Sequence, residues 1–501
     1  MPRGSIRSRL VLDPLRKPLR RGLFSKTKLR AKIQQFITTS TTPWQKPFHR
    51  RALTDFSFQF SRLADLVNAN CSEILIVGGK VSLSRLNEAI AFEVHRRKTL
   101  HRLLFDIPGK TRQEGIHTIS PDIRVIEQEV PSHAEAELRA LLVANIWENS
   151  VPVHRLHGIK TFCITFRNLT VIQFVTSHLL SDARAGYKLT ADVVDSYNKL
   201  SDGLELRAAD IEPWNGDLEL HLSSIDHIRY FSAAVIRILR DHHTFERGTT
   251  MSKFVPSARD ILKHVFTRNT FALVLRKRTE LGVTLHPILV TAAVKAWAIH
   301  KFGRDKIEGS YRIADLYSFR RYVSANNQNA YDTMVIPFFP RIKLREDVTQ
   351  TILQLQHALD KEKHGRIFAE LYRQRVYRIV SLVLPKRFAI QLALRCNAKT
   401  ELIITNPGII DLGHTRFGNV EIVDFFSFSQ LFPPGRMMIV FNTFADELRA
   451  TVVYDVKCFA RSDVIKLVEQ MEQELQSIGD DSCGQIGVAV TANDRVGVAV
   501  P

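Results

Sequence analysis

Residues 170–187 constrain the chain most, because an apolar run, a histidine, a carboxylate and a helical pattern follow one another there. The run 171–175 is too continuously apolar for a half-exposed strand and is typical of one covered on both faces. His178 comes just after this strand, Asp182 lies four residues later, and apolar residues from 189 to 200 then fall on one helical face. An imidazole at the mouth of a buried strand can accept a proton near neutral pH, while Asp182 could hold the loop.

The spacing alone leaves a second interpretation open. In a chain with 18 histidines, roughly one HxxxD arises by chance. His178 would then be a satisfied histidine at a strand end, and Asp182 would be the N-cap of the next helix.

The segment TSHLLSDARAGYKL resembles the HHxxxDG segment of the CoA-dependent acyltransferase superfamily. That superfamily includes chloramphenicol acetyltransferase, condensation domains of nonribosomal peptide synthetases, alcohol O-acetyltransferases and polyketide-associated acyltransferases. The similarity spans about residues 50–478, and HxxxD is its only sharp motif. Other stretches are similar mainly in their apolar pattern: 71–100 (opening strand and helix), 282–302 (second-lobe helix), 311–323 (strand ending in a basic residue) and 401–410 (the "isNlG" strand).

Two positions depart from the family pattern. Ser177 stands where the family usually has its first histidine, which is commonly replaced in such enzymes. Ala183 stands where the family has glycine, and a methyl group there could narrow the site.

The resemblance implies an α/β fold with two chloramphenicol acetyltransferase-like lobes in a V around a central channel. It implies that His178 is the general base and that no covalent acyl-enzyme forms. Asp182 would point away from the substrate and pair with an arginine at a strand end of the second lobe. Arg320 is the expected partner, with Arg321 as the alternative.

The implied function is acyl transfer from a thioester, either acyl-CoA or a phosphopantetheinyl acyl carrier protein, to an alcohol or amine. We expect a monomer without a permanently bound cofactor, metal or nucleic acid. Residues 241–243 (DHH) lack a third ligand at useful spacing and favour an exposed helix end over a metal site. The alternative function is a non-catalytic, condensation-like binding or scaffold protein, which Ser177 and Ala183 keep open.

A length of 501 residues exceeds one ordinary core and predicts two lobes. We expect a basic arm over 1–52, an N-terminal lobe over 53–240, a C-terminal lobe over 241–478 and a mobile tail over 479–501. Residues 1–54 hold 14 Lys or Arg and one acid, so they carry +13 of the net +19.

The basic arm has several interpretations. It could be an organelle transit peptide, a contact with anionic membrane or nucleic acid, or a solvated disordered segment. We expect a cytoplasmic, soluble or surface-associated protein, with organelle targeting as the alternative, because no apolar run approaches the 18 or so residues that cross a bilayer. Five scattered cysteines without a CxxC pair indicate a reducing compartment.

The remaining patterns predict an alternation of strands and helices. Segments 160–166 and 170–176 are spaced as a hairpin, and Gly78-Gly79-Lys80 is expected to be a turn after a strand. The predicted strands are 74–78, 160–166, 170–176, 311–319, 401–405, 437–443 and 449–454; the predicted helices lie near 86–94, 134–147, 189–200, 225–239, 287–303 and 462–475.

Overall fold

The computed structural model describes part of the chain, and every described residue belongs to one compact unit formed by Leu53–Trp214 and Leu218–Pro501. The predicted arm over 1–52, and all but two residues of the predicted tail, lie outside the described part. The described residues are 70–103, 117–118, 123–131, 134–148, 151, 159–178, 180–211, 224–243, 259–304, 309–323, 331–361, 369–370, 372–373, 376, 400, 402–431 and 435–480.

The first six-stranded sheet is mainly antiparallel. It runs in the order β13 (Arg416–Phe417), β14 (Val420–Ser429), β1 (Asn70–Val77), β6 (Leu169–Ser177), β5 (Ile159–Phe166) and β4 (Val125–Val130). β5 and β6 form the predicted hairpin through a two-residue turn at Arg167 and Asn168. Arg167 has a φ of 55°, as a tight hairpin turn requires.

Helices cover both faces of this sheet. α4 (Leu83–His95) and α6 (Ala183–Ser201) pack on one face, where Ile90 and Val193 join Phe174 in a buried cluster. α5 (Glu135–Trp147) packs on the other face. All residues of β6 from Thr170 to Ser177 are buried, so the prediction of a strand covered on both faces is confirmed.

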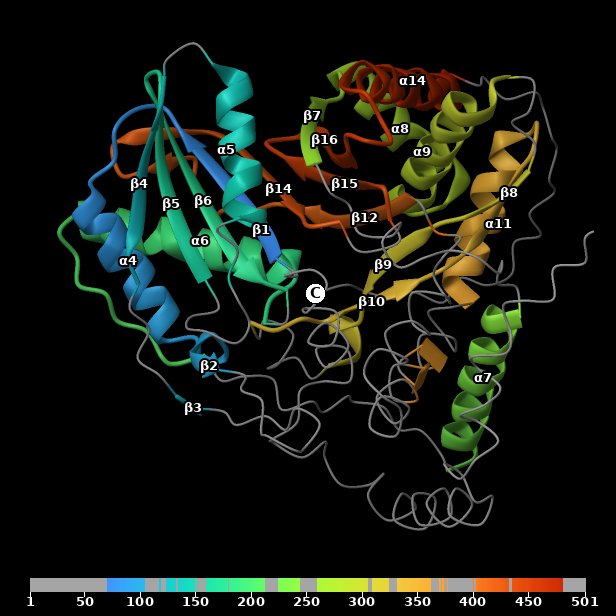
Figure 1. Ribbon diagram of the computed structural model, residues 1–501, viewed down its shortest axis with the longest axis horizontal. Coiled ribbons are helices and arrows are strands. Elements are labelled where there is room, and N and C mark those ends of the chain that lie inside the picture. Colours follow the sequence, from blue (N-terminus) through green and yellow to red (C-terminus); the bar gives the residue numbers. More distant parts are fainter. Residues whose placement is uncertain are drawn as a thin grey trace, which may run out of the picture. The chain divides into compact units, whose positions relative to one another are not determined.

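The second sheet is mixed. It runs in the order β10 (Val335–Phe338), β9 (Ala314–Ser318), β12 (Leu402–Ile409), β15 (Met437–Phe444), β16 (Glu447–Asp455) and β7 (Arg259–Val265), with β12 parallel to both β9 and β15. One large apolar cluster joins this sheet to four helices, which Figure 1 shows beside the sheet. These are α8 (Arg268–Leu281), α9 (Leu285–Phe302), α11 (Val348–Lys361) and α14 (Arg461–Asp480).

α9 shows how sequence produces this packing. Small residues such as Ala292, Ala293 and Ala296 are completely or almost completely buried, which lets neighbouring elements approach closely. The helix ends at Gly303, as the sequence predicts. α7 (Ser224–His243) spans the predicted helix at 225–239 and ends with the DHH segment.

Strand β14 joins the two halves of the chain. It lies late in the sequence, within the predicted C-terminal lobe, yet it pairs antiparallel with β1 in the first sheet. Phe426 and Phe428 of β14 share an apolar cluster with Met438 and Val440 of β15.

Polar contacts also join β14 to the second sheet. The carboxylate of Asp424 on β14 accepts hydrogen bonds from Lys263 on β7 and Arg449 on β16. A single boundary near residue 240 therefore does not hold for this strand.

The prediction of a single strand over 311–319 is wrong in one respect. The segment forms two short strands, β8 (Gly309–Arg312) and β9, which belong to different sheets. β8 pairs with β11 (Arg341–Leu344), whereas β9 lies in the second large sheet. The break falls at Ile313, which is buried and donates its N–H to the carbonyl of Pro340. A continuous apolar pattern does not reveal such a change of partner strand.

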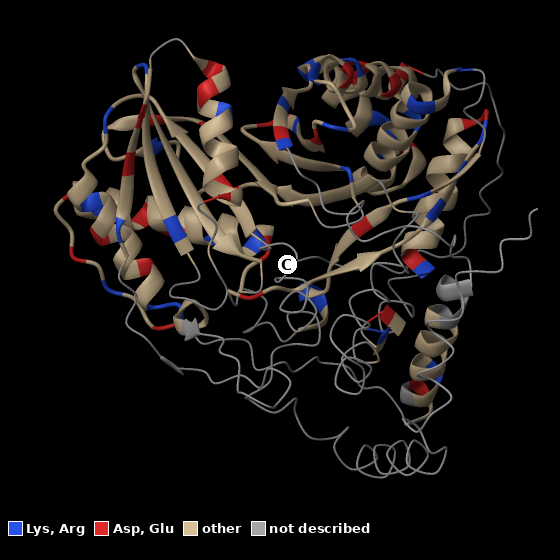
Figure 2. Cartoon of the chain, viewed as in Figure 1, with Lys and Arg blue, Asp and Glu red and all other residues tan. Residues whose placement is uncertain are grey.

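Acidic and basic residues are interspersed over the described helices and strands (Figure 2). Cys71 and Cys163 are buried free thiols. No single helix in the described part of the chain combines the length and apolar character needed to cross a membrane.

Candidate active site

The loop that follows β6 is folded back on the strand end. The carbonyl of Ser177 accepts hydrogen bonds from the N–H groups of Leu180 (2.9 Å) and Ser181 (3.1 Å). This turn brings Asp182 to the N-cap of α6, where its carboxylate accepts the N–H of Ala185 at 2.9 Å. The N-cap interpretation of Asp182 is therefore confirmed, and His178 and Asp182 both lie between a buried strand and a helix.

The carboxylate of Asp182 accepts further hydrogen bonds from the second half of the chain. Its Oδ1 accepts Nη2 of Arg320 at 2.8 Å, and its Oδ2 accepts the N–H of Met334 at 2.9 Å. Together with the N–H of Ala185 these give the carboxylate three donors, although only 1% of the residue is exposed. A buried carboxylate with such partners is held in one position.

Arg320 lies where the sequence predicts a basic residue after a strand. It opens a short 3₁₀ turn, Arg320–Tyr322, that follows β9. Its Nη2 also donates to the carbonyl of Asp332 at 2.7 Å. Arg321, the alternative partner, instead donates to the hydroxyl of Tyr322 at 2.7 Å, in an exposed contact.

The short segment 332–334 supports the loop from the second half of the chain, although no sequence pattern predicts this. Thr333 donates its hydroxyl to the carbonyl of His178 at 2.6 Å. The N–H of Thr333 is in turn held by the carboxylate of Asp332 at 2.8 Å. Thr333 and Met334 thus contact the loop through a hydroxyl and a backbone N–H, while Asp332 accepts hydrogen bonds from Thr333 and Arg320. No residue motif marks such contacts.

The side chain of His178 is withdrawn from solvent, with 4% of the residue exposed. Burial lowers the pKa of His178 below its ordinary value of 6.5, because the charged imidazolium loses solvation. The charge of Asp182 and hydrogen bonds with the backbone of His178 and Ser181 partly oppose this shift. The imidazole is accordingly neutral at neutral pH, which is the form that accepts a proton.

The two departures from the family pattern lie at different places. Ser177 is the last residue of β6 and is buried. Ala183 is the first residue of α6, and its methyl group packs against the apolar cluster beneath the helix. Among the described glycines, Gly186 leaves the least room for a side chain. A Cβ added there, three residues after Ala183, would lie 2.2 Å from Oε1 of Glu73.

Gly186→Ala is expected to lower the free energy of unfolding by about 1–3 kcal/mol, because the new methyl group would overlap the buried carboxyl of Glu73. Chemical denaturation of the variant measures this. The double variant Glu73→Ala/Gly186→Ala is the matched control, since it removes the group that the methyl would strike. If the double variant loses as much stability as the two single substitutions do together, the overlap is not the cause.

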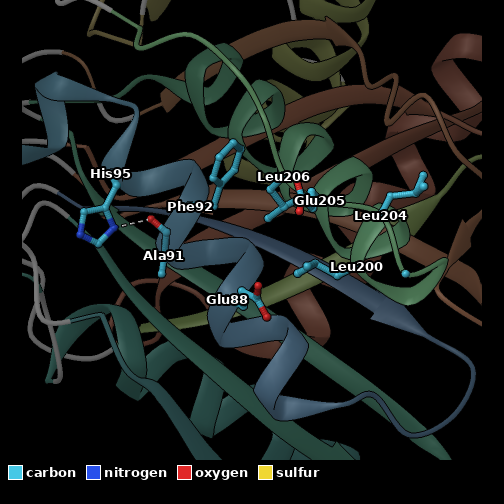
Figure 3. A pocket seen from close by; sticks show the side chains of 9 residues that line it. Glu88, Ala91, Phe92, His95, Leu200, Leu204, Glu205 and Leu206 are labelled. Carbon is cyan, nitrogen blue, oxygen red and sulfur yellow. Dashed lines mark hydrogen bonds between the residues drawn. The ribbon is translucent and has the colours of Figure 1, made fainter.

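A hollow of about 660 Å³ lies elsewhere, at the C-terminal end of α6 (Figure 3). Phe92 and His95 of α4 and Leu204 and Glu205 of the following segment are among its lining residues. α6 has 19 residues, which places its two ends about 28 Å apart. This hollow is therefore separate from the loop of His178 and Asp182.

The described residues contain no group of three or more His, Cys, Asp or Glu that could hold a metal ion. The candidate site comprises His178, the ion pair of Asp182 and Arg320, and the segment 332–334. Sequence reasoning named the first three residues, while the segment 332–334 and Glu73 carry no local signal that points to the site.

No protein-family model and no curated protein matches the sequence. Solved structures do match the fold. The first condensation domain of the CDA synthetase is 12% identical, has a TM-score of 0.62, and is matched over 86% of this chain and 96% of that one. TRI3 trichothecene 15-O-acetyltransferase from Fusarium sporotrichioides is 11% identical, with a TM-score of 0.62 and coverages of 86% and 94%.

A third similar structure is the starter condensation domain of rhizomide synthetase RzmA in complex with C8-CoA and Leu-SNAC. It is 12% identical, has a TM-score of 0.59, and is matched over 88% of this chain and 96% of that chain. At such identities the likeness concerns the fold, and it confirms the fold expected from the resemblance. The chain therefore has the two-lobed α/β fold shared by condensation domains and acyltransferases of the chloramphenicol acetyltransferase type.

Proposed function

We propose that the protein is an acyltransferase that moves an acyl group from a thioester to a hydroxyl or amine, with His178 as general base. The donor is acyl-CoA or an acyl carrier protein. His178 takes the proton of the acceptor as the acceptor oxygen or nitrogen attacks the thioester carbonyl. The tetrahedral intermediate then expels the thiolate, which receives the proton from the imidazolium, so no covalent acyl-enzyme forms.

The observation that carries this proposal is the division of labour between His178 and Asp182. The carboxylate of Asp182 is occupied by Arg320, Ala185 and Met334, so it is not available to accept a proton from an acceptor. His178 is neutral and follows the strand directly, on a loop fixed at both ends. Among the residues of this loop it is therefore the group suited to proton transfer.

The thioester donor is supported by the chemistry of the similar structures. The rhizomide starter condensation domain has a complex with C8-CoA, and TRI3 is an acetyltransferase by name. Both similarities show the fold alone. The donor and the acceptor are therefore proposals for this chain. A contact of the basic arm over 1–52 with anionic membrane is a further proposal, which rests on the charge of the arm.

The proposed function is tested by thiol release from a panel of acyl-CoAs, with and without a mixed pool of alcohols and amines. Acceptor-dependent release that is lost in His178→Ala supports the acyltransferase. Absence of release from every acyl-CoA, with donor binding intact by calorimetry, directs the test to acyl carrier protein donors. If those also give no transfer, the non-catalytic binding function, which Ser177 and Ala183 keep open, replaces the proposal.

The activity is expected to fall at acidic pH with a midpoint below 6.5, because burial lowers the pKa of His178 and only its neutral form accepts a proton. The measurement is kcat/KM for the acceptor between pH 4.5 and 8, corrected for the stability of the enzyme. A midpoint well above 6.5 would show that the acidic decline in activity belongs to a titratable group other than His178.

A further inference from the structure

Glu73 is a buried carboxyl group that the proposed mechanism does not use. It lies in the middle of β1, opposite Phe174 of β6 and Ser427 of β14, and 1% of the residue is exposed. Its side chain points to the face of the sheet covered by α6, because its carboxyl lies where a side chain at Gly186 would stand. Glu73 therefore lies beneath the first turn of the helix that Asp182 caps.

No residue in the described part of the chain forms an ion pair with the carboxyl of Glu73. Neither of its oxygens has a hydrogen-bond partner from another residue that the structure describes. Arg320, the cation of the site, is committed to Asp182. An ionised carboxylate in this position would lack both solvent and a partner, which costs far more than burial of the neutral acid.

The titratable groups around Glu73 come from each element packed against it. They are Cys71 on β1, Asp182 before α6, Tyr187 on α6 and Tyr331 in the segment before β10. Burial raises the pKa of Cys71, Tyr187 and Tyr331, so these three are neutral around pH 7. Burial likewise raises the pKa of Glu73 well above 4.5, the negative charge of Asp182 raises it further, and a hydrogen bond from its own N–H acts in the opposite direction.

We propose that Glu73 is a positioning residue: held as an uncharged acid beneath α6, it keeps the loop of His178 and Asp182 in place, and its ionisation loosens that loop. A charge on Glu73 would repel Asp182 and draw water under the first turn of α6. Since Asp182 caps this turn and His178 precedes it, both would shift. The role in activity rests on the proposed acyltransferase function, whereas the uncharged state of Glu73 does not.

The sign of the pH effect follows from proton binding. Below the pKa of the unfolded chain, near 4.5, Glu73 carries its proton in both states and its contribution to stability is complete. Above it, the folded protein keeps the proton that the unfolded chain releases. Each further pH unit then shifts the unfolding equilibrium by up to tenfold toward the unfolded state, until the folded pKa is passed.

Thermal and urea unfolding between pH 5 and 9 tests this with wild type, Glu73→Gln and, as control, Glu129→Gln, an exposed glutamate on β4. Wild type and Glu129→Gln are expected to lose stability with rising pH more steeply than Glu73→Gln, by up to tenfold in the unfolding constant per pH unit. If the buried amide of Glu73→Gln prevents folding, Glu73→Leu, which also has no titrating group, takes its place in the comparison. Equal pH slopes in wild type and both Glu73 variants would overturn the proposal.

The second readout is the pH profile of acceptor-dependent thiol release. Wild type is expected to lose activity at alkaline pH, and Glu73→Gln to lose this decline while keeping the acidic limb of His178. An alkaline decline that persists in Glu73→Gln would overturn the positioning role. If wild type releases no thiol at any pH, the acyltransferase fails, and the unfolding slopes still decide whether Glu73 is uncharged.

Discussion

His178→Ala is expected to lower kcat/KM for acceptor-dependent thiol release by about 10²–10⁴-fold, the range that a general base contributes. The fold should persist, because the loop is held by Asp182 and by the bond from Thr333 to the carbonyl of residue 178, which the substitution leaves in place. The measurement combines kinetics with thermal unfolding of the same preparation.

His300→Ala is the matched control for this substitution. His300 is exposed near the end of α9, so its replacement should leave both activity and melting temperature close to those of wild type. Full activity in His178→Ala would remove the histidine from the mechanism.

Asp182→Asn is expected to lower the free energy of unfolding by about 3–5 kcal/mol, which is the usual cost of removing one partner of a buried ion pair. The carboxylate accepts Arg320, Ala185 and Met334, whereas an amide presents one oxygen and adds an NH₂ group among donors. Arg320 would then keep a buried charge without its anion. Activity should fall as well, because the loop that carries His178 is no longer fixed.

The control for Asp182→Asn is Asp195→Asn on the same helix. The side chain of Asp195 is 42% exposed and pairs with Lys199 and His414, so its replacement should change stability by no more than about 0.5 kcal/mol. The double variant Asp182→Asn/Arg320→Met should be less damaged than the two single effects combined, since it removes both charges. The assigned roles are wrong if His178→Ala destabilises the protein as much as Asp182→Asn.

The parts of the site that the sequence predicts are those with local patterns. The strand, loop and helix around His178 show in hydrophobic spacing, because a buried strand must be apolar and a helix must cover it. The pairing of Asp182 with Arg320 was expected only from the resemblance, since no local pattern joins residues so far apart. The structure places the two in contact, and their roles in catalysis stay predictions.

The remaining contacts could not be predicted from sequence for physical reasons. Met334 contributes its backbone N–H, which every residue except proline possesses, so its identity carries no signal. Glu73 lies two residues after Cys71 in an ordinary strand pattern, and nothing local indicates that its carboxyl has no hydrogen-bond partner among the described residues. The pairing of β14 with β1 depends on tertiary packing between distant segments, which periodicity does not contain.

The place of β14 in the first sheet also affects how the protein is made. During synthesis, β1 and β6 leave the ribosome long before β14, and the side of β1 that β14 will occupy is left as an unpaired strand edge. Closing so long a loop slows folding, and the exposed edge offers a place for association with other chains in the interval. The first lobe is completed only when Ser429 has been synthesised, so its folding is tied to that of the second lobe.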